Sequence, residues 1–333
     1  ENLLENSWLF KRNVKTSFIQ KLPFGISHVQ QYLPLLPFAV EQIDLEGYPL
    51  VISSSHLVAK GVLTSPDQLH ISYVHTPVRY AWDQMNIYLK RSFLRRIGLG
   101  PLIRWQLHTL RQWDQLSSSR VDYLLANSTF TAKRIWKYWR RHSEVLYPPV
   151  NINRFEWEKP REDFYLSVCR LVPNKRVDLV VRAFNKLKLP LVVVGDGVEK
   201  AYLKDLAGPT VQILGFQSKE KIEKLMSRCR AFVYAGIEDF GIAPVEAMAS
   251  GAPVIAFAKG GVLDTVKCFN SNSDERATGL LFPDQTVKSL VEAIEFFKEK
   301  QLWRDLNPEL IRDWSNSFSQ DSFKKRFEQT INR

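Results

Sequence analysis

The second half of the chain alternates short apolar runs with amphipathic segments, and this alternation limits the fold more than any other feature of the sequence. Strands are predicted at residues 163–171, 189–197, 211–216, 230–236 and 252–257, and helices at 175–187, 198–207, 219–229 and 243–250. Buried strands separated by helical patterns of about ten residues predict right-handed βαβ units and a doubly wound parallel sheet, which is an α/β fold. Ligands of such sheets bind at the carboxyl ends of the strands.

The first half has the same character but is less regular. Strands are predicted at residues 48–55, 70–77 and 120–128 and a helix at 128–139, while 86–116 predicts two basic amphipathic helices interrupted at Gly98 to Pro101. A chain of 333 residues is long for one core, so two domains are expected. Adjacent prolines before Val150 are typical of a linker, and we place the domain boundary there.

The segment "GIEDFGIAPVEAMASGAPVIAF", Gly236 to Phe257, places Glu238 at a strand end and Glu246 in the first two turns of the following helix. The residues between them leave backbone N–H groups at the helix N-terminus, which suit a diphosphate or sugar hydroxyls, and Gly241 permits close approach. Two such carboxylates can bind the two hydroxyl-bearing ends of a nucleotide sugar. The alternative is that the acidic residues only complement the helix dipole.

Two cations add to this pattern. Arg170 and Lys175 lie just beyond a predicted strand and before a helix, where a guanidinium and an ammonium group can neutralise a diphosphate. Taken singly, each is more commonly a solvated surface cation. Their position beside the acidic pair favours a function in phosphate binding.

Five segments together resemble the donor domain of family 4 glycosyltransferases in order and spacing: "CRLVPNKRVD", "VVVGDG", "ILGF", "EDFGIAPVEAMASGAPVIAFAKGG" and "TGLLFPDQT". In the first half, "DLEGYPLVISSSHLVAKGV" and "HISYVHTPVRYAWD" are similar to the bacterial O-antigen and exopolysaccharide mannosyltransferase branch. The resemblance implies a GT-B fold, with two Rossmann-like domains facing each other across a cleft. It implies an acceptor domain at 1–150, a nucleotide-sugar domain at 151–310, and a C-terminal helix at 311–333 that packs back on the first domain.

The resemblance also implies roles for the acidic motif. Glu246 would bind the ribose hydroxyls and Glu238 the transferred sugar. The backbone amides of Phe240, Gly241 and Ile242 would contact the sugar and phosphate.

Further site residues follow from the same resemblance. Arg170 and Lys175 would stabilise the leaving diphosphate, where charge develops in the transition state. Gly195 and Gly215, at two strand ends, would belong to the donor site. His75 would contact the sugar or support the reacting centre from the first domain, although a lone His is more often structural.

The implied reaction retains the anomeric configuration and needs no metal or other cofactor, consistent with the absence of a D-x-D signature or a His/carboxylate ligand cluster in the sequence. By resemblance the preferred donor is GDP-mannose, with a UDP-sugar as the alternative. The implied acceptor is a lipid-linked or polysaccharide glycan in the synthesis of cell-surface material such as lipopolysaccharide. A dinucleotide dehydrogenase is disfavoured because "GDGVEKAYL" contains no G-x-G-x-x-G.

The sequence departs from the family pattern at its start. Members normally begin with a strand and a glycine-rich loop, whereas "ENLLENSWLFKRNVKTSFIQKLPFG" corresponds to a later region, short by roughly 40 residues. We therefore expect an incomplete N-terminal domain and weak or absent activity of this exact polypeptide. A non-catalytic GT-B protein that acts as a partner subunit is the alternative.

Charge and cysteine usage suggest a location. Residues 1–150 carry 18 Lys and Arg against 10 Asp and Glu, and their basic aromatic segments suit an anionic membrane surface. A solvated helix face is the alternative, and no nucleic-acid-binding motif is present. Three distant cysteines and no signal-peptide pattern indicate a reducing cytoplasm, so we expect a cytoplasmic protein peripheral to the inner face of the plasma membrane.

Overall fold

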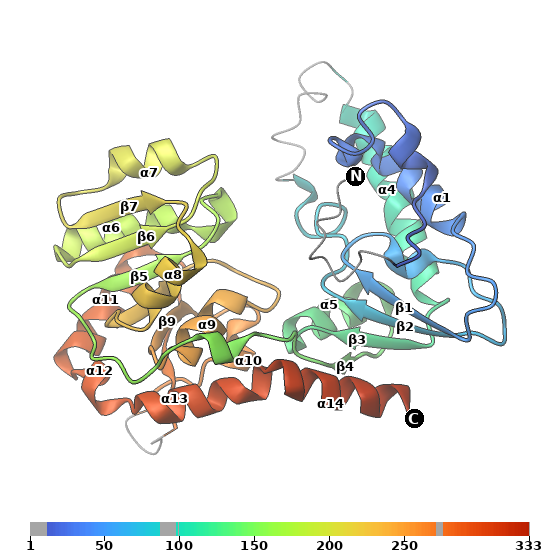
Figure 1. Ribbon diagram of the computed structural model, residues 1–333. Coiled ribbons are helices and arrows are strands. Elements are labelled where there is room, and N and C mark those ends of the chain that lie inside the picture. Colours follow the sequence, from blue (N-terminus) through green and yellow to red (C-terminus); the bar gives the residue numbers. More distant parts are fainter. Residues whose placement is uncertain (1–11, 87–97, 99, 271–275, 333) are drawn as a thin grey trace. The chain divides into compact units, whose positions relative to one another are not determined.

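A computed structural model describes residues 12–86, 98, 100–270 and 276–332 (Figure 1). The chain falls into two compact units. Unit 1 comprises residues 1–127 and 131–145, and unit 2 comprises residues 128–130 and 146–333. Each unit has its own parallel sheet and its own buried apolar residues.

Unit 1 contains a four-stranded parallel sheet in the order β1-β2-β3-β4. The strands are β1 Leu50–Ser55, β2 Leu69–Val74, β3 Tyr123–Ala126 and β4 Glu144–Val145. The helices are η1 Phe18–Lys21, η2 Val29–Leu35, α1 Leu36–Glu41, η3 Ala59–Gly61, α4 Gly100–Ser118 and α5 Thr129–Trp139, whose first residues are counted with unit 2. The strands predicted at 48–55, 70–77 and 120–128 and the helix at 128–139 are confirmed.

The basic segment 86–116 is described only in part. Its second predicted helix is α4, which begins at Gly100 within the predicted interruption. The first predicted helix falls almost entirely on 87–97, outside the described residues. Among the described residues, no helix is both long enough and apolar enough to cross a lipid bilayer.

A buried ion pair anchors α4 in unit 1. Lys60 and Asp114 are both fully buried, and their Nζ and Oδ1 atoms lie 2.7 Å apart. The indole N–H groups of Trp82 and Trp139 donate to the other oxygen of Asp114 at 2.8 and 2.7 Å, and Lys60 donates to Ser117 at 3.0 Å. Burial lowers the pKa of Lys60, whereas the Asp114 charge acts in the opposite direction. The network therefore compensates two charges that would be costly to bury alone.

Unit 2 contains a six-stranded parallel sheet in the order β10-β9-β8-β5-β6-β7. The strands are β5 Tyr165–Val168, β6 Leu191–Val194, β7 Val211–Gly215, β8 Ala231–Tyr234, β9 Val254–Phe257 and β10 Gly279–Phe282. The sheet extends in one direction from β5 through β6 and β7, and in the other through β8, β9 and β10. This is the doubly wound order of a Rossmann-like domain, which confirms the predicted α/β fold, and β5 and β8 form its switch point.

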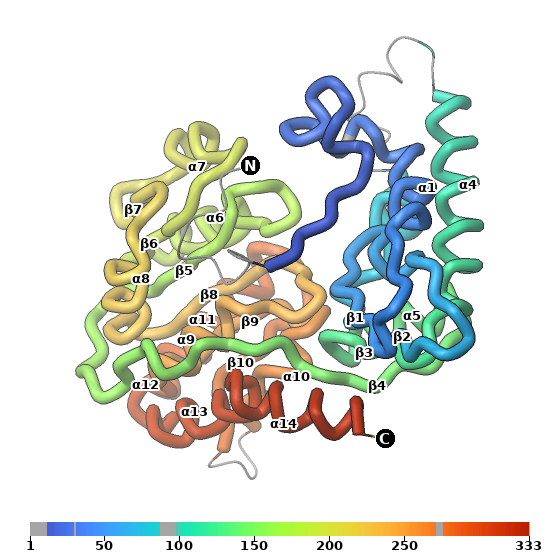
Figure 2. The backbone as a smooth tube through the Cα atoms, turned by 45° about the vertical axis from the view of Figure 1, so that its right-hand side comes forward, coloured from blue at the N-terminus to red at the C-terminus, as the bar shows by residue number. Residues whose placement is uncertain are grey.

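Helices precede, separate and follow the strands of unit 2. They are η4 Ile152–Arg154, η5 Pro173–Lys175, α6 Val177–Leu187, α7 Lys200–Leu206, α8 Lys219–Met226, α9 Ile242–Ala249, α10 Val262–Thr265, α11 Val287–Glu299, α12 Leu302–Asp305, α13 Pro308–Ser315, η6 Asn316–Phe318 and α14 Gln320–Ile331. α6 packs against α11, and α9 packs against α13 (Figure 2). The predicted packing of the C-terminal helix on the first domain stays a prediction.

The segment that enters unit 2 is fixed near α14. Val150 donates its N–H to the carbonyl of Phe318 at 2.9 Å and forms an isolated parallel bridge with Ser319. The ring of Tyr147 packs edge-on against that of Phe318 at a centroid distance of 5.2 Å. Residues 147–150 therefore belong structurally with the C-terminal residues of unit 2.

Candidate functional site

Three strand ends of unit 2 meet in close backbone contact. Gly195, directly after β6, has a φ of +145°, and a Cβ there would lie 1.8 Å from the carbonyl oxygen of Cys169. Its N–H donates to the carbonyl of Gly215, the last residue of β7, at 2.9 Å. Gly215 has a φ of +75°. Both predicted glycines therefore lie at the carboxyl edge of the sheet, where only a residue without a side chain fits easily.

The acidic motif occupies the neighbouring connection, between β8 and α9. Glu238 forms an ion pair with Lys175, the last residue of η5. The hydroxyl group of Tyr234, at the end of β8, donates to the same carboxylate oxygen of Glu238 at 2.7 Å. The structure thus brings together Lys175 and Glu238, which the sequence had singled out separately, and adds Tyr234, which it had not.

Arg170 and Cys169 lie in the turn after β5. The Arg170 side chain is exposed there. Burial raises the pKa of the Cys169 thiol to about 11, so at neutral pH it is protonated and a poor nucleophile. Arg170 therefore remains the residue of this turn with the chemistry to bind an anion.

A glycine pair after β9 supports the acidic loop. Gly261 donates its N–H to the carbonyl of Glu238 at 2.9 Å. A Cβ on Gly260, whose φ is +95°, would lie 2.5 Å from that same carbonyl oxygen, and one on Gly261 would lie 2.4 Å from the Cα of Phe240. "AKGG" was part of the family pattern, but its role in supporting the Glu238 loop could not be read from the sequence.

The start of α9 presents backbone rather than side chains. Gly241 is its N-cap residue, with a φ of +95° and no capping side-chain hydrogen bond. The Phe240 side chain is buried and lies near the rings of Tyr147 and Phe318 at 5.9 and 5.7 Å. Ile242 is 49% exposed. Because the first N–H groups of a helix have no acceptor within it, these three predicted residues can offer donors to an anion.

Glu246, in the second turn of α9, is held by an arginine that sequence reasoning missed. Nη2 of Arg154 lies 2.5 Å from Oε1 of Glu246, and Nη1 lies 3.2 Å from Oε1 of Glu223 in α8. Burial raises the pKa of Glu246, while the charge and hydrogen bond of Arg154 lower it. Arg154 follows the predicted linker, and nothing in its local pattern points to this contact.

His75 belongs to unit 1, directly after β2. Its Nε2 lies 2.8 Å from the hydroxyl oxygen of Ser54, and its ring packs edge-on against that of Tyr73. Its backbone carbonyl accepts from the side-chain amide of Asn127 at 2.9 Å. His75 is thus at the carboxyl edge of the unit 1 sheet, and its contact with a donor sugar stays a prediction.

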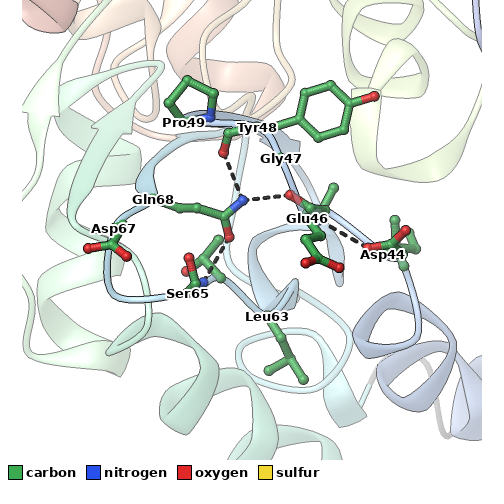
Figure 3. A pocket seen from close by; sticks show the side chains of 12 residues that line it. Asp44, Glu46, Gly47, Tyr48, Pro49, Leu63, Ser65, Asp67 and Gln68 are labelled. Atoms are coloured by element: carbon green, nitrogen blue, oxygen red, sulfur yellow. Dashed lines mark hydrogen bonds between the residues drawn. The ribbon is translucent and has the colours of Figure 1, made fainter.

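A separate cavity of about 680 Å³ lies at the opposite edge of that sheet (Figure 3). It is formed by residues 43–49, 63–65, 67 and 68, around the starts of β1 and β2. The amide of Gln68 donates to the carbonyls of Leu45 and Tyr48 at 2.5 and 2.7 Å and accepts from the N–H of Ser65 at 2.8 Å. These bonds brace the loops internally, and the cavity includes none of the predicted site residues.

A metal site needs a grouping of ligating side chains that the described residues lack. Across residues 12–86, 98, 100–270 and 276–332, no three His, Cys, Asp or Glu side chains are grouped so that they could hold a metal ion. The expected metal independence stays a prediction.

Proteins of known sequence resemble this chain over much of its length. "Alpha-1,3/1,6-mannosyltransferase ALG2" of Kluyveromyces lactis is 27% identical over 330 residues, covering 81% of this chain and 62% of the relative. The human ALG2 protein is 27% identical over 252 residues, covering 63% and 56%. The chain therefore spans less than two thirds of the length of these relatives. Both relatives are eukaryotic, and the predicted bacterial branch stays a prediction.

Solved structures resemble the fold. The Anabaena Alr3699/HepE structure in complex with UDP and glucose gives a TM-score of 0.64 at 18% identity, covering 93% of this chain and 84% of the other. Sucrose-phosphate synthase from Thermosynechococcus elongatus gives 0.67 at 17% identity, covering 92% and 79%. These likenesses support the predicted GT-B fold of two Rossmann-like domains. The family model for glycosyl transferases group 1 matches residues 150–316, which include Arg154, Lys175, Glu238 and Glu246, and the chain belongs to that family.

Proposed function

We propose that this chain is a retaining transferase that moves a hexose, preferably mannose, from a nucleotide sugar to a lipid-linked or polysaccharide glycan. The observation that carries the proposal is the position of Glu238 and Glu246 on either side of the α9 N-terminus, beside the switch point of the unit 2 sheet. The ALG2 relatives are alpha-1,3/1,6-mannosyltransferases, which supports mannose as the transferred sugar.

Each part of the nucleotide sugar has its own binding residues in this proposal. Glu246 accepts hydrogen bonds from the ribose hydroxyls, and Glu238 from the transferred sugar. The diphosphate lies at the backbone of residues 240–242, where helix N–H groups favour negative charge. Gly195 and Gly215 keep two neighbouring strand ends free of side chains.

Arg170 and Lys175 act on the leaving group. The bond between the anomeric carbon and the diphosphate oxygen breaks as an acceptor hydroxyl oxygen attacks the same face of the sugar. The hydroxyl proton passes to a diphosphate oxygen, and the two cations stabilise the charge that develops there. His75 supports the reacting centre from unit 1. We expect the transfer to need neither a metal ion nor another cofactor.

GDP-mannose is the proposed donor, and a UDP-sugar is the alternative because a UDP complex occurs among the structural neighbours. The proposed acceptor side is unit 1, with attachment to an anionic membrane surface. Exposed Trp105 and Leu102 on α4, together with Arg104, support that attachment because aromatic and basic side chains suit a lipid headgroup layer. We further propose that this membrane surface is the inner face of the plasma membrane. The transfer would then serve the synthesis of bacterial cell-surface polysaccharides.

The test is mannose transfer from labelled GDP-mannose to a lipid-linked oligosaccharide, with and without a metal chelator. Weak, chelator-insensitive transfer that is lost in Glu238→Gln and Glu246→Gln is expected. Nucleotide binding without any transfer would favour the non-catalytic partner subunit. Transfer that both variants retain would contradict the assigned site.

A further inference from the structure

Arg154 bridges two carboxylates of unit 2. Its Nη2 contacts Oε1 of Glu246 at 2.5 Å, and its Nη1 contacts Oε1 of Glu223 at 3.2 Å. The guanidinium carbon lies 4.5 Å from the ring centroid of Phe155. The side chain of Arg154 is only 27% exposed, so these contacts hold it in one orientation.

The backbone that carries Arg154 is fixed to the helix that carries Glu246. Arg312 in α13 donates from one nitrogen to the carbonyl of Ile152 at 2.6 Å and to that of Ala249, the last residue of α9, at 3.3 Å. Ile152 and Phe155, on either side of Arg154, are both buried. The arginine therefore reaches Glu246 from a rigid support.

The contact with Arg154 affects the pKa of Glu246. Burial raises the pKa of Glu246, Arg154 lowers it, and the charge of Glu223 raises it. The other arginines at the end of α9, Arg312 and Arg161, donate to the backbone carbonyls of Ala249 and Ser250. The direct ionic contact found for Glu246 thus comes from Arg154 and uses one carboxylate oxygen, Oε1.

We propose that Arg154 is a positioning residue for donor binding: it keeps Glu246 ionised and turned so that its other oxygen meets the ribose hydroxyls, while Glu223 holds Arg154 in place. Arg154 itself does not touch the nucleotide. This inference rests on the proposed function, because that function assigns the ribose to Glu246. It extends the proposed donor site to Arg154, which lies in the segment before β5.

The experiment is calorimetric titration of the chain with GDP and UDP between pH 5 and pH 8, for wild type and Arg154→Gln. An opposite charge in contact lowers the pKa of a carboxyl group, so removal of the Arg154 cation raises the pH at which Glu246 titrates. The variant should bind about tenfold more weakly relative to wild type at the acidic end than at pH 8. Arg154→Lys restores a cation and should follow the wild-type profile.

Three controls separate the possible results. Arg230→Gln removes an arginine of the same unit that pairs with Asp163, and its affinity ratio to wild type should not change with pH. In the double variant Arg154→Gln/Glu246→Gln the extra pH dependence should vanish. Thermal unfolding of each variant checks that the chain is folded.

The outcomes also distinguish this inference from the proposed function. If Glu246→Gln binds both nucleotides like wild type, the ribose assignment itself is wrong. If Glu246→Gln weakens binding but Arg154→Gln has no effect, or the same effect at every pH, Arg154 has only a structural role and the inference is overturned.

Discussion

Lys175, the last residue of η5, forms an ion pair with Glu238, which lies in the loop after β8. Both follow the neighbouring strands β5 and β8, so the switch point of the sheet brings together a cation and an anion that are distant in sequence. The side chains of Lys175 and Glu238 are 17% and 26% exposed. A donor that enters this site would meet a positive and a negative group side by side, as a sugar diphosphate requires.

Lys175→Gln should weaken binding of a nucleoside diphosphate far more than binding of the matching nucleoside. A hydrogen bond to a charged group contributes about 1.5–3 kcal/mol, so we expect roughly a tenfold or greater loss for the diphosphate. Titration calorimetry with GDP and guanosine measures the difference. An equal loss for both ligands would mean that Lys175 acts on the shape of the site rather than on phosphate.

Tyr234→Phe should lower the rate of sugar transfer with little change in nucleotide affinity. The substitution removes the 2.7 Å hydrogen bond to Glu238 but leaves the buried ring in place. Among the described residues, Lys175 would then be the remaining side-chain partner of the Glu238 carboxylate, which would orient the sugar less well, at a cost of about 1.5 kcal/mol or roughly tenfold in kcat. Unchanged kcat together with weaker GDP binding would contradict this role.

Gly260→Ala should disrupt the donor site. Its Cβ would lie 2.5 Å from the Glu238 carbonyl at a φ of +95°, so we expect a loss of more than about 2 kcal/mol in unfolding free energy and of measurable GDP binding. Gly47→Ala is the matched control. Gly47 has a φ of +81° but no atom within 4 Å of the added Cβ, so only a conformational cost of about 1 kcal/mol remains. Equal losses for both variants would show that the contact with the Glu238 loop is unimportant.

Lys60→Met or Asp114→Asn should each destabilise the chain by about 3–5 kcal/mol, because each leaves one charge buried without its partner. The double variant Lys60→Met/Asp114→Leu should recover part of this loss. Urea unfolding, followed by a probe in unit 1, measures the effect. Single variants as stable as wild type would mean that the network contributes nothing to stability.

The sequence predicted β5 to β9 and the helices α6 to α9 between them, because these strands are short apolar runs and these helices are amphipathic. It also singled out Glu238, Glu246 and Lys175 as candidate site residues, since their family pattern is local. It could not reveal that Arg154 reaches Glu246, because that contact depends on how the segment before the sheet packs. The same holds for Lys60, because only the folded chain brings Asp114 to Lys60 and two indole N–H groups to Asp114.

The proposed donor site is tested most directly by calorimetric titration of the chain with GDP, UDP, ADP and the matching nucleotide sugars, beside Glu246→Ala. We predict selective binding of one nucleotide, GDP, and its loss in the folded variant. Failure of every nucleotide to bind, or equal binding by wild type and Glu246→Ala, would contradict the assignment of the donor site to unit 2.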